Sequence, residues 1–184
     1  TFIIDPIDGT TNYMRGRRAS TISVGAVENG RVVFGAVLDP YHGELYHASR
    51  GQGAWCGETR LHVSDVLFDN AIICLGTSPY DSALVDVTAR CAAAIMRQCA
   101  DLRRTGSAAL DLCDVAAGRC EGAFEWRLQP WDYCAGSLLV EEAGGCAGGI
   151  LGGGPAFEAG MAFMSGSARC FEPLRQLLQS CREN

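Results

Sequence analysis

Residues 20–38, STISVGAVENGRVVFGAVL, constrain the fold most, because they have the pattern of a β-hairpin. Two runs rich in β-branched residues flank Asn29-Gly30, and Asn-Gly between apolar runs is a strong hairpin signal. A second turn is predicted from Pro40 to Glu44, followed by a strand over residues 45–49. Shorter strands are predicted around Trp55 and Leu61. We therefore expect residues 1–68 to form an antiparallel-sheet lobe.

The rest of the chain, residues 69–184, alternates strand-like and helix-like runs. Strands are predicted over 71–76, 101–106, 121–126 and 161–166, and helices over 81–98, 107–118, 132–143 and 168–181. Alternation of this kind indicates a layered α/β arrangement. The glycine-rich segment 144–155 lacks the Gly-Lys-Ser/Thr ending of a phosphate loop, and we interpret it as a flexible hairpin.

The composition excludes several classes of protein. The chain has 184 residues, of which 48% are hydrophobic and 20% charged, so one domain or two small lobes sharing a core is expected. Its formal net charge is -6, which argues against a nucleic-acid partner, since nucleic acid selects a broad basic face. The tight basic cluster Arg15, Arg17 and Arg18 is interpreted as a solvated loop, with a minor role toward an anionic substrate as the alternative.

Ten cysteines are many for this length, but no two form a Cys-x-x-Cys pair of the kind that binds zinc. Several lie in apolar runs, as Cys113 does in ALDLCDVAAG. Free cysteine behaves as a small buried hydrophobe, so we expect reduced core thiols in a cytoplasmic protein. The apolar runs are too short to span a membrane, and no membrane association is expected.

Two acids, Asp5 and Asp8, lie three residues apart around Pro6 and directly after the apolar run 1–4, which we interpret as the end of a buried strand. Proline fixes the backbone torsion there, so both carboxylates can point to one spot. Close carboxylates repel unless a cation lies between them, and oxygen ligands of this kind suit Mg²⁺. The carbonyl of Ile7 is a further candidate ligand in the same turn.

Gly9, Thr10 and Thr11 follow the acids at once. Glycine allows close approach of the backbone to a ligand, and the unpaired N–H groups at a helix start form an anion site. Metal ligands and phosphate donors would then lie side by side, as phosphoryl chemistry requires. The alternative is an ordinary Asx turn in which Asp8 bonds to its own backbone.

A third acid, Asp132 in QPWDYCAGSLLVEEAGG, is the candidate that completes a metal site. We place it at the first position of the helix that ends before Gly144, where an N-cap worth about 1 kcal/mol is the alternative role. The two roles are compatible, because one carboxylate oxygen can cap the helix while the other binds metal.

The stretches DPIDGTTNY and PWDYCAGSLLVEEAGG, in this order, resemble the signatures of the inositol monophosphatase family of Mg²⁺-dependent, lithium-sensitive phosphatases. GQGAWCG, RRTGSAALDL and GAFEW also fit that family. The resemblance implies an alternating αβαβα sandwich of the sugar-phosphatase type, two or three Mg²⁺ ions and commonly a homodimer. It also implies a Gly-Glu-Glu segment upstream of the first motif, so we expect an N-terminal helical segment to be missing from this chain.

The resemblance also implies a role for each site residue. Asp5 would bridge two metals, the Ile7 carbonyl would bind the first, and Asp8 and Asp132 would bind the second. The catalytic residues would be Asp5 and Thr10, whose hydroxyl would help orient the attacking water. The substrate would contact Gly9, Thr10, Gly106, Ser107, Ala108, Glu125 and Asp132.

The implied reaction is hydrolysis of a small polyol or sugar phosphate monoester, inositol monophosphate first among them. One metal would activate a water and the other would neutralise the leaving oxygen. Fructose-1,6-bisphosphatase, histidinol phosphatase and nucleotide bisphosphatase activities on the same frame stay open as alternatives, as does a non-catalytic regulatory relative. No histidine nucleophile is required, and His42, His47 and His62 are interpreted as surface or packing residues.

Overall fold

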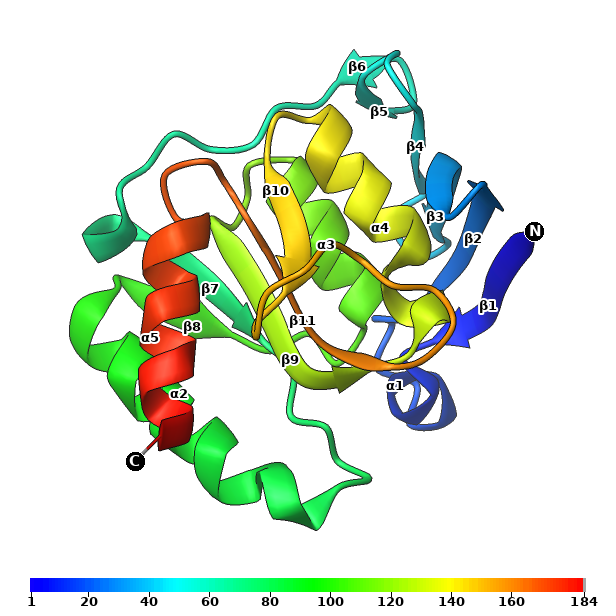
Figure 1. Cartoon of the computed structure of the whole chain (residues 1–184). Coiled ribbons are helices and arrows are strands. Elements are labelled where there is room, and N and C mark those ends of the chain that lie inside the picture. The colour runs from blue at the N-terminus through cyan, green and yellow to red at the C-terminus, as the bar shows by residue number, and fades with distance from the viewer. Residues whose placement is uncertain (184) are drawn as a thin grey trace.

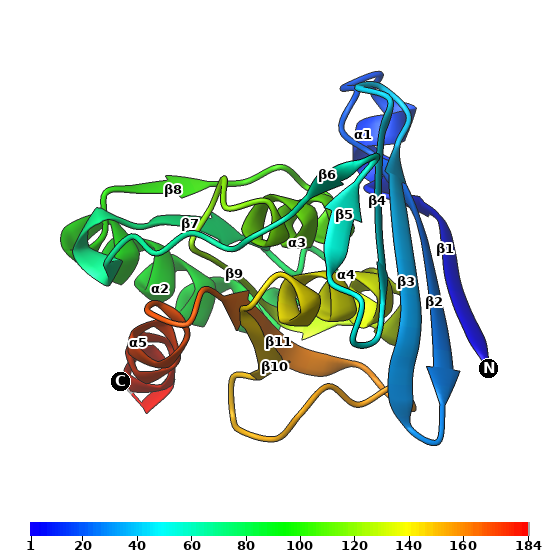
Figure 2. The same cartoon turned by 90° about the horizontal axis from the view of Figure 1, so that it is seen from above.

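The computed structural model describes residues 1–183. Two sheets enclose one pair of helices, and a second pair of helices covers the far side of the second sheet (Figures 1 and 2). The prediction of a layered α/β fold is confirmed. The boundary between a lobe 1–68 and a lobe 69–184 stays a prediction.

The first sheet is an antiparallel meander, in the order β1-β2-β3-β4-β5-β6. Its strands are β1 (Phe2–Asp8), β2 (Thr21–Glu28), β3 (Arg31–Asp39), β4 (Glu44–Ser49), β5 (Ala54–Cys56) and β6 (Thr59–Arg60). A short helix, α1 (Thr10–Met14), lies between β1 and β2. The predicted hairpin is confirmed: Glu28 pairs with Arg31, and both Asn29 and Gly30 have positive φ, as the favoured two-residue hairpin turn demands.

The second sheet has the order β10-β11-β9-β7-β8, with β7 parallel to both of its neighbours. Its strands are β7 (Ile72–Leu75), β8 (Asp101–Arg103), β9 (Gly122–Leu128), β10 (Cys146–Gly149) and β11 (Met161–Gly166). The helices are α2 (Val85–Gln98), α3 (Ala108–Ala116), α4 (Pro130–Glu142) and α5 (Phe171–Glu183), with short 3₁₀ turns at Phe68–Asn70 and Ser82–Leu84.

Several predicted boundaries were wrong for identifiable reasons. The strand expected to end at Ile4 continues through Pro6 to Asp8, because β1 is an edge strand and an edge strand tolerates a residue without an N–H. That strand is also not buried, since Phe2 and Ile4 are exposed. The glycine-rich segment is partly ordered as β10, which pairs with β11. The last helix begins at Phe171 rather than at 168.

The core lies in two layers. One cluster fills the space between the sheets around α3 and α4, and includes Tyr46, Leu112 and Leu138. The other packs α2 and α5 on the second sheet around Ile95 and Leu178. Only the first cluster draws side chains from both sheets and from α4, so it fixes the two sheets relative to that helix.

The cysteines follow the predicted pattern. All ten are free thiols, and seven of them are buried: Cys74, Cys91, Cys113, Cys120, Cys134, Cys170 and Cys181. Cys146 is the exposed exception. Within residues 1–183, no helix combines the length and the apolar character that a bilayer span needs.

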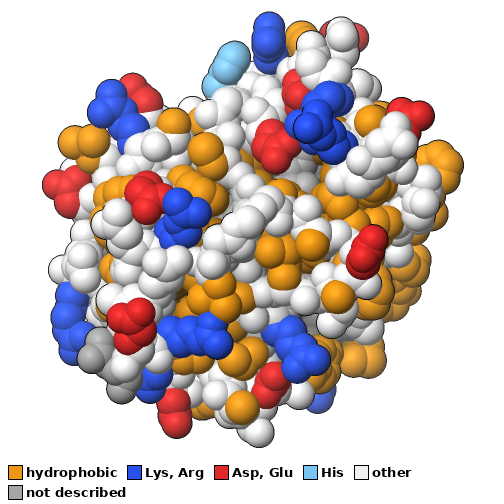
Figure 3. Space-filling model, in the orientation of Figure 1, with side chains coloured by type: hydrophobic (Ala, Val, Ile, Leu, Met, Phe, Trp, Pro, Cys, Tyr) orange, Lys and Arg blue, Asp and Glu red, His pale blue; other side chains and the backbone are white. Residues whose placement is uncertain are grey.

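The outer face of the first sheet is apolar. Its register places Phe2, Ile4, Ile22, Phe34 and Leu45 on the side opposite α4, and all five are exposed. Elsewhere, basic and acidic side chains are interspersed, as Figure 3 shows for one face of the molecule. On that face the mixture of signs does not form the broad basic surface that nucleic acid selects.

Close packing of α4 on the first sheet depends on Gly35. A Cβ atom at Gly35 would lie 2.7 Å from the carbonyl oxygen of Ala135, which is backbone and cannot rotate away. We expect Gly35→Ala to lower the free energy of unfolding by about 1–3 kcal/mol, the usual cost of overpacking. Urea unfolding measures this. Gly154→Ala is the control, because nothing lies within 4 Å of its Cβ position, and equal midpoints for the two variants would contradict the expectation.

Candidate active site

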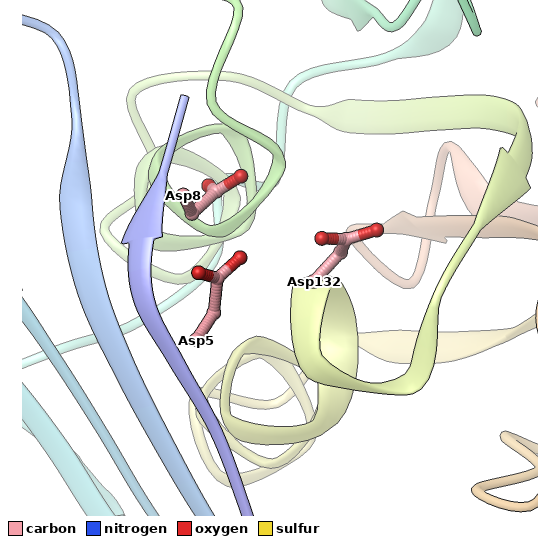
Figure 4. A group of neighbouring side chains, drawn as sticks. All are labelled: Asp5, Asp8 and Asp132. Carbon is pink, nitrogen blue, oxygen red and sulfur yellow. The ribbon is translucent and has the colours of Figure 1, made fainter. Parts of the chain in front are cut away.

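Three carboxylates gather where β1 meets the start of α4 (Figure 4). Asp5 and Asp8 come from β1 and Asp132 from the first turn of α4. One oxygen of each lies within 4.8 Å of the others. The structure thus brings together the three acids that the sequence selected from two motifs far apart in the chain.

Asp8 is held by the first turn of α3. Its side chain is buried, and its Oδ2 accepts hydrogen bonds from the Ser107 hydroxyl at 2.5 Å and from the Ala109 N–H at 2.8 Å. The Ser107 hydroxyl also lies 3.3 Å from the hydroxyl of Thr21. These contacts, together with a hydrogen bond from the Gly9 N–H, fix the Asp8 carboxylate beside Asp5 and Asp132.

Ser107 therefore has a role that the sequence did not predict, which is to hold the Asp8 carboxylate. It was expected to line the substrate pocket, yet it is only 1% exposed and its hydroxyl contacts Asp8. It also caps α3, since its hydroxyl oxygen accepts a hydrogen bond from the Leu110 N–H at 3.3 Å. This hydroxyl couples the start of α3 to the acid cluster.

Asp5 and Ile7 form a local irregularity in β1. The Ile7 N–H donates to Asp5 Oδ1 at 2.9 Å, and the pairing with β2 shifts register between Asp5 and Asp8. The Thr10 hydroxyl donates to the Ile7 carbonyl at 3.1 Å. The bulge thus brings the Asp5 carboxylate and the Ile7 carbonyl close to the Thr10 hydroxyl, so that the three groups lie in one small region.

Gly9 joins β1 to α1 in a conformation that favours glycine. Its φ is +81°, and a Cβ there would lie 2.9 Å from the Ala19 carbonyl oxygen and 3.2 Å from that of Gly106. The Tyr13 N–H bonds to the Gly9 carbonyl at 3.0 Å, so the predicted helical turn does begin here. The segment 105–107 consequently lies directly against the motif.

Asp132 is the third residue of α4, not the first as predicted. Pro130 occupies the first helical position, where a missing N–H costs nothing, and the helix starts two residues earlier than expected. Asp132 Oδ2 accepts from the Gln129 N–H at 2.7 Å, as the acid of a capping box does. The interpretation that one carboxylate can both cap the helix and face the cluster fits this position.

The electrostatics favour a cation at this site. Burial raises the pKa of Asp5 and Asp8, and the neighbouring Asp5 raises that of Asp8 further. Burial, opposed by the Gln129 hydrogen bond and assisted by the charges of Asp8 and Asp5, raises the pKa of Asp132 to about 7. Three hard oxygen donors with unfavourable ionisation suit Mg²⁺, which would relieve both the burial cost and the repulsion.

Glu125 lies on β9 beside the cluster. It accepts a hydrogen bond from the Ser78 N–H at 2.5 Å, and its carboxylate packs where a side chain on Gly76 would otherwise sit. Burial raises its pKa, and its charge contributes to the raised pKa of Asp132. Glu125 and Ala108 also line one small cavity. The arginines of the predicted cluster, Arg15, Arg17 and Arg18, are exposed.

Asn12 is a site residue that sequence reasoning missed. It is buried, and its amide donates to the Ala19 carbonyl at 2.7 Å and to the Thr105 carbonyl at 2.9 Å. The motif DGTTN contains this residue, but nothing in the sequence says that it contacts a residue 93 positions away. The contact fixes α1 against the loop that precedes α3.

This chain belongs to the inositol monophosphatase family, whose model matches residues 1–181. It is 41% identical over 157 residues to the Nus factor SuhB of Escherichia coli K12, covering 83% of this chain and 57% of that protein. It is 39% identical over 184 residues to the inositol-1-monophosphatase of Rhizobium meliloti, covering 97% of this chain and 67% of that protein. The solved structure of SaIMPase-II with inositol monophosphate bound superposes with a TM-score of 0.89 at 28% identity, covering 99% of this chain and 72% of that chain.

Proposed function

We propose that this chain forms the active site of a Mg²⁺-dependent phosphatase that hydrolyses small polyol or sugar phosphate monoesters, with inositol monophosphate as the preferred substrate. The observation that carries the proposal is the carboxylate cluster of Asp5, Asp8 and Asp132, within 4.8 Å and beside the start of α1. Family membership and the inositol monophosphate bound to SaIMPase-II support the substrate class. The chain spans 57% of the length of its E. coli relative, so the activity is proposed for the protein as its gene encodes it.

Two or three Mg²⁺ ions would bind here, held by Asp5, Asp8, Asp132 and the Ile7 carbonyl. Bound Mg²⁺ supplies charge neutralisation and a lowered pKa for water. The protein residues orient what binds there. Ser107 and the Ala109 N–H fix Asp8, and the Gln129 N–H fixes Asp132, so the ligands are arranged before a substrate arrives.

The remaining roles concern the substrate. We propose that the backbone N–H groups of Gly9 and Thr10 hold the phosphate at the start of α1. The Thr10 hydroxyl donates its proton to the Ile7 carbonyl, so its oxygen can accept a hydrogen bond from the attacking water. Glu125, Gly106 and Ala108 would contact the alcohol part of the ester, whereas the buried Ser107 would act through Asp8.

A second candidate is a non-catalytic regulatory role, favoured by the 41% identity to a protein named as a Nus factor. The two functions differ in what they require of the acid cluster. A phosphatase needs the cluster to bind metal and turn over an ester, whereas a regulatory protein needs neither. We further propose a cytoplasmic homodimer, with fructose-1,6-bisphosphatase, histidinol phosphatase and nucleotide bisphosphatase activities as the enzymatic alternatives.

Phosphate release from a substrate panel tests the proposal in the protein expressed from its complete gene. We expect inositol monophosphate to be hydrolysed fastest in the presence of Mg²⁺, and EDTA to abolish release because the carboxylates alone cannot activate water. Restoring excess Mg²⁺ after EDTA is the control. Chelator-resistant turnover would refute the metal requirement, preference for a bisphosphate would refute the substrate, and no turnover of any ester would favour the regulatory candidate.

A further inference from the structure

Asp111 is a buried acid that the proposed mechanism does not use. It lies in the first turn of α3, is 6% exposed, and its Oδ1 lies 2.6 Å from the hydroxyl oxygen of Thr105. Thr105 in turn lies two residues before Ser107, which holds Asp8. A short chain of contacts therefore joins Asp111 to a carboxylate of the acid cluster.

The Thr105 hydroxyl has three close polar partners and one proton. It accepts from the Ser107 N–H at 3.1 Å, lies 3.0 Å from the Ser107 carbonyl oxygen, and lies 2.6 Å from Asp111. A hydroxyl donates once and accepts twice. If Asp111 is ionised, the hydroxyl proton must go to the carboxylate, and the Ser107 carbonyl loses its contact with Thr105.

If Asp111 is protonated, every contact is satisfied. The acid donates a hydrogen bond to the Thr105 hydroxyl oxygen, and the Thr105 hydroxyl donates its proton to the Ser107 carbonyl. The Thr105 oxygen still accepts a hydrogen bond from the Ser107 N–H. An acid in the first turn of a helix is normally stabilised in its ionised form. Here burial outweighs that effect and raises the pKa of Asp111 to about 8, helped by the charges of Asp114 and Asp8 and opposed by hydrogen bonds from Thr105 and Cys74.

The turn 105–107 is held from its other side as well. The Asn12 amide donates to the Thr105 carbonyl at 2.9 Å, so this turn is fixed between α1 and α3. Gly106, at its centre, has a φ of +87° and packs against Asn12. Asp111 supplies the contact on the α3 side.

We infer that Asp111, in its protonated form, is a positioning residue for the proposed phosphatase site, acting through Thr105 and Ser107 to orient Asp8. This inference rests on the proposed function for its consequence in catalysis. Its consequence for Mg²⁺ binding can be measured without turnover. Residues that orient metal ligands in this way typically contribute about 10–100-fold to metal affinity or activity.

The test compares Asp111→Asn, Asp111→Ala, Thr105→Val and Thr105→Ser in the protein expressed from its complete gene. Mg²⁺ affinity is measured by isothermal titration calorimetry, and kcat and KM with inositol monophosphate, from pH 6 to 9. We expect Asp111→Ala and Thr105→Val to weaken Mg²⁺ binding about 10–100-fold. Asp111→Asn and Thr105→Ser should stay close to wild type, because the amide still donates and the serine keeps the hydroxyl. Asp86→Asn, at an exposed acid in the first turn of α2, is the control for loss of a charge.

The pH profile separates positioning from simple packing. Above about pH 8 the wild-type acid ionises, takes the Thr105 hydroxyl proton as its hydrogen bond and breaks the contact between Thr105 and the Ser107 carbonyl, whereas the amide of the Asp111→Asn variant cannot ionise. The ratio of Mg²⁺ affinities, Asp111→Asn over wild type, should therefore rise with pH. The charged and titratable neighbours that face Asp111 are unchanged in this comparison: Cys74 on β7, Asp114 on α3, Asp8 on β1, and Glu125 on β9, which lines the same small cavity as Asp111.

Each result has a distinct meaning. Equal Mg²⁺ affinity for wild type and Asp111→Ala would overturn the positioning role, and so would an Asp111→Asn variant as weak as Asp111→Ala. If Asp111→Ala does not fold, Thr105→Val against Thr105→Ser decides the same question. Normal Mg²⁺ binding without ester hydrolysis by the wild type would contradict the proposed function alone.

Discussion

Replacing Asp132 by Asn is expected to lower kcat by at least about 100-fold without lowering the melting temperature. Loss of a residue that merely orients a metal ligand costs up to about 100-fold, so loss of a ligand should cost at least as much. The fold should tolerate the change, because the amide oxygen of the Asp132→Asn variant can still accept the hydrogen bond that the Gln129 N–H now donates to Asp132. The amide also relieves the cost of burying a carboxylate whose pKa is raised to about 7.

Steady-state kinetics with inositol monophosphate at several Mg²⁺ concentrations, together with thermal melting, measure both effects. Asp81→Asn is the matched control, since Asp81 also accepts a backbone N–H at a helix start, from Ala83 at 3.2 Å, but lies outside the acid cluster. Near-normal kcat for Asp132→Asn at saturating Mg²⁺ would show that Asp132 serves the helix and not the metal.

The acid cluster was predictable because each of its residues stands in a local motif with a chemical reason. Two carboxylates around Pro6 and a third after Trp131 were enough to select Asp5, Asp8 and Asp132. The meander was predictable for the same reason, since Asn29-Gly30 fixes a hairpin locally. The sequence also contained the signal for the true start of α4, because Pro130 suits the first helical position.

The support of the cluster was not predictable, because it depends on contacts between residues far apart in the chain. Asn12 reaches Thr105, and Ser107 reaches Asp8 across 99 positions. The sequence predicted Ser107 at the pocket surface. A local sequence identifies the neighbours of a residue along the chain but not how deeply its side chain is buried. Only the packing of α3 against β1 shows that its hydroxyl points to a carboxylate.

Stability without metal is expected to fall as the pH rises from about 4 to about 7. The pKa of Asp132 is raised from 3.8 to about 7 in the folded protein, and those of Asp5 and Asp8 are raised too. Between these values the folded state binds more protons than the unfolded state, so the free energy of unfolding decreases with pH. The direction is opposite to that of an acid stabilised by an ion pair, because here the ionised form is the one that folding disfavours.

Mg²⁺ should reverse this trend, since it binds the ionised cluster. At a concentration about 100 times its dissociation constant it should add about 2.7 kcal/mol at pH 8, or roughly 5–10 °C in melting temperature. At pH 5 protons compete for the same oxygens, so the shift should be much smaller. Thermal melting at both pH values measures the difference between the two Mg²⁺ shifts, with NaCl of equal ionic strength in place of MgCl₂ as the control. Asp132→Asn should reduce both the pH dependence of the melting temperature and its shift with Mg²⁺. An equal Mg²⁺ shift at pH 5 and pH 8 would mean that the ion binds elsewhere, because only a site built from these three acids couples metal binding to their protons.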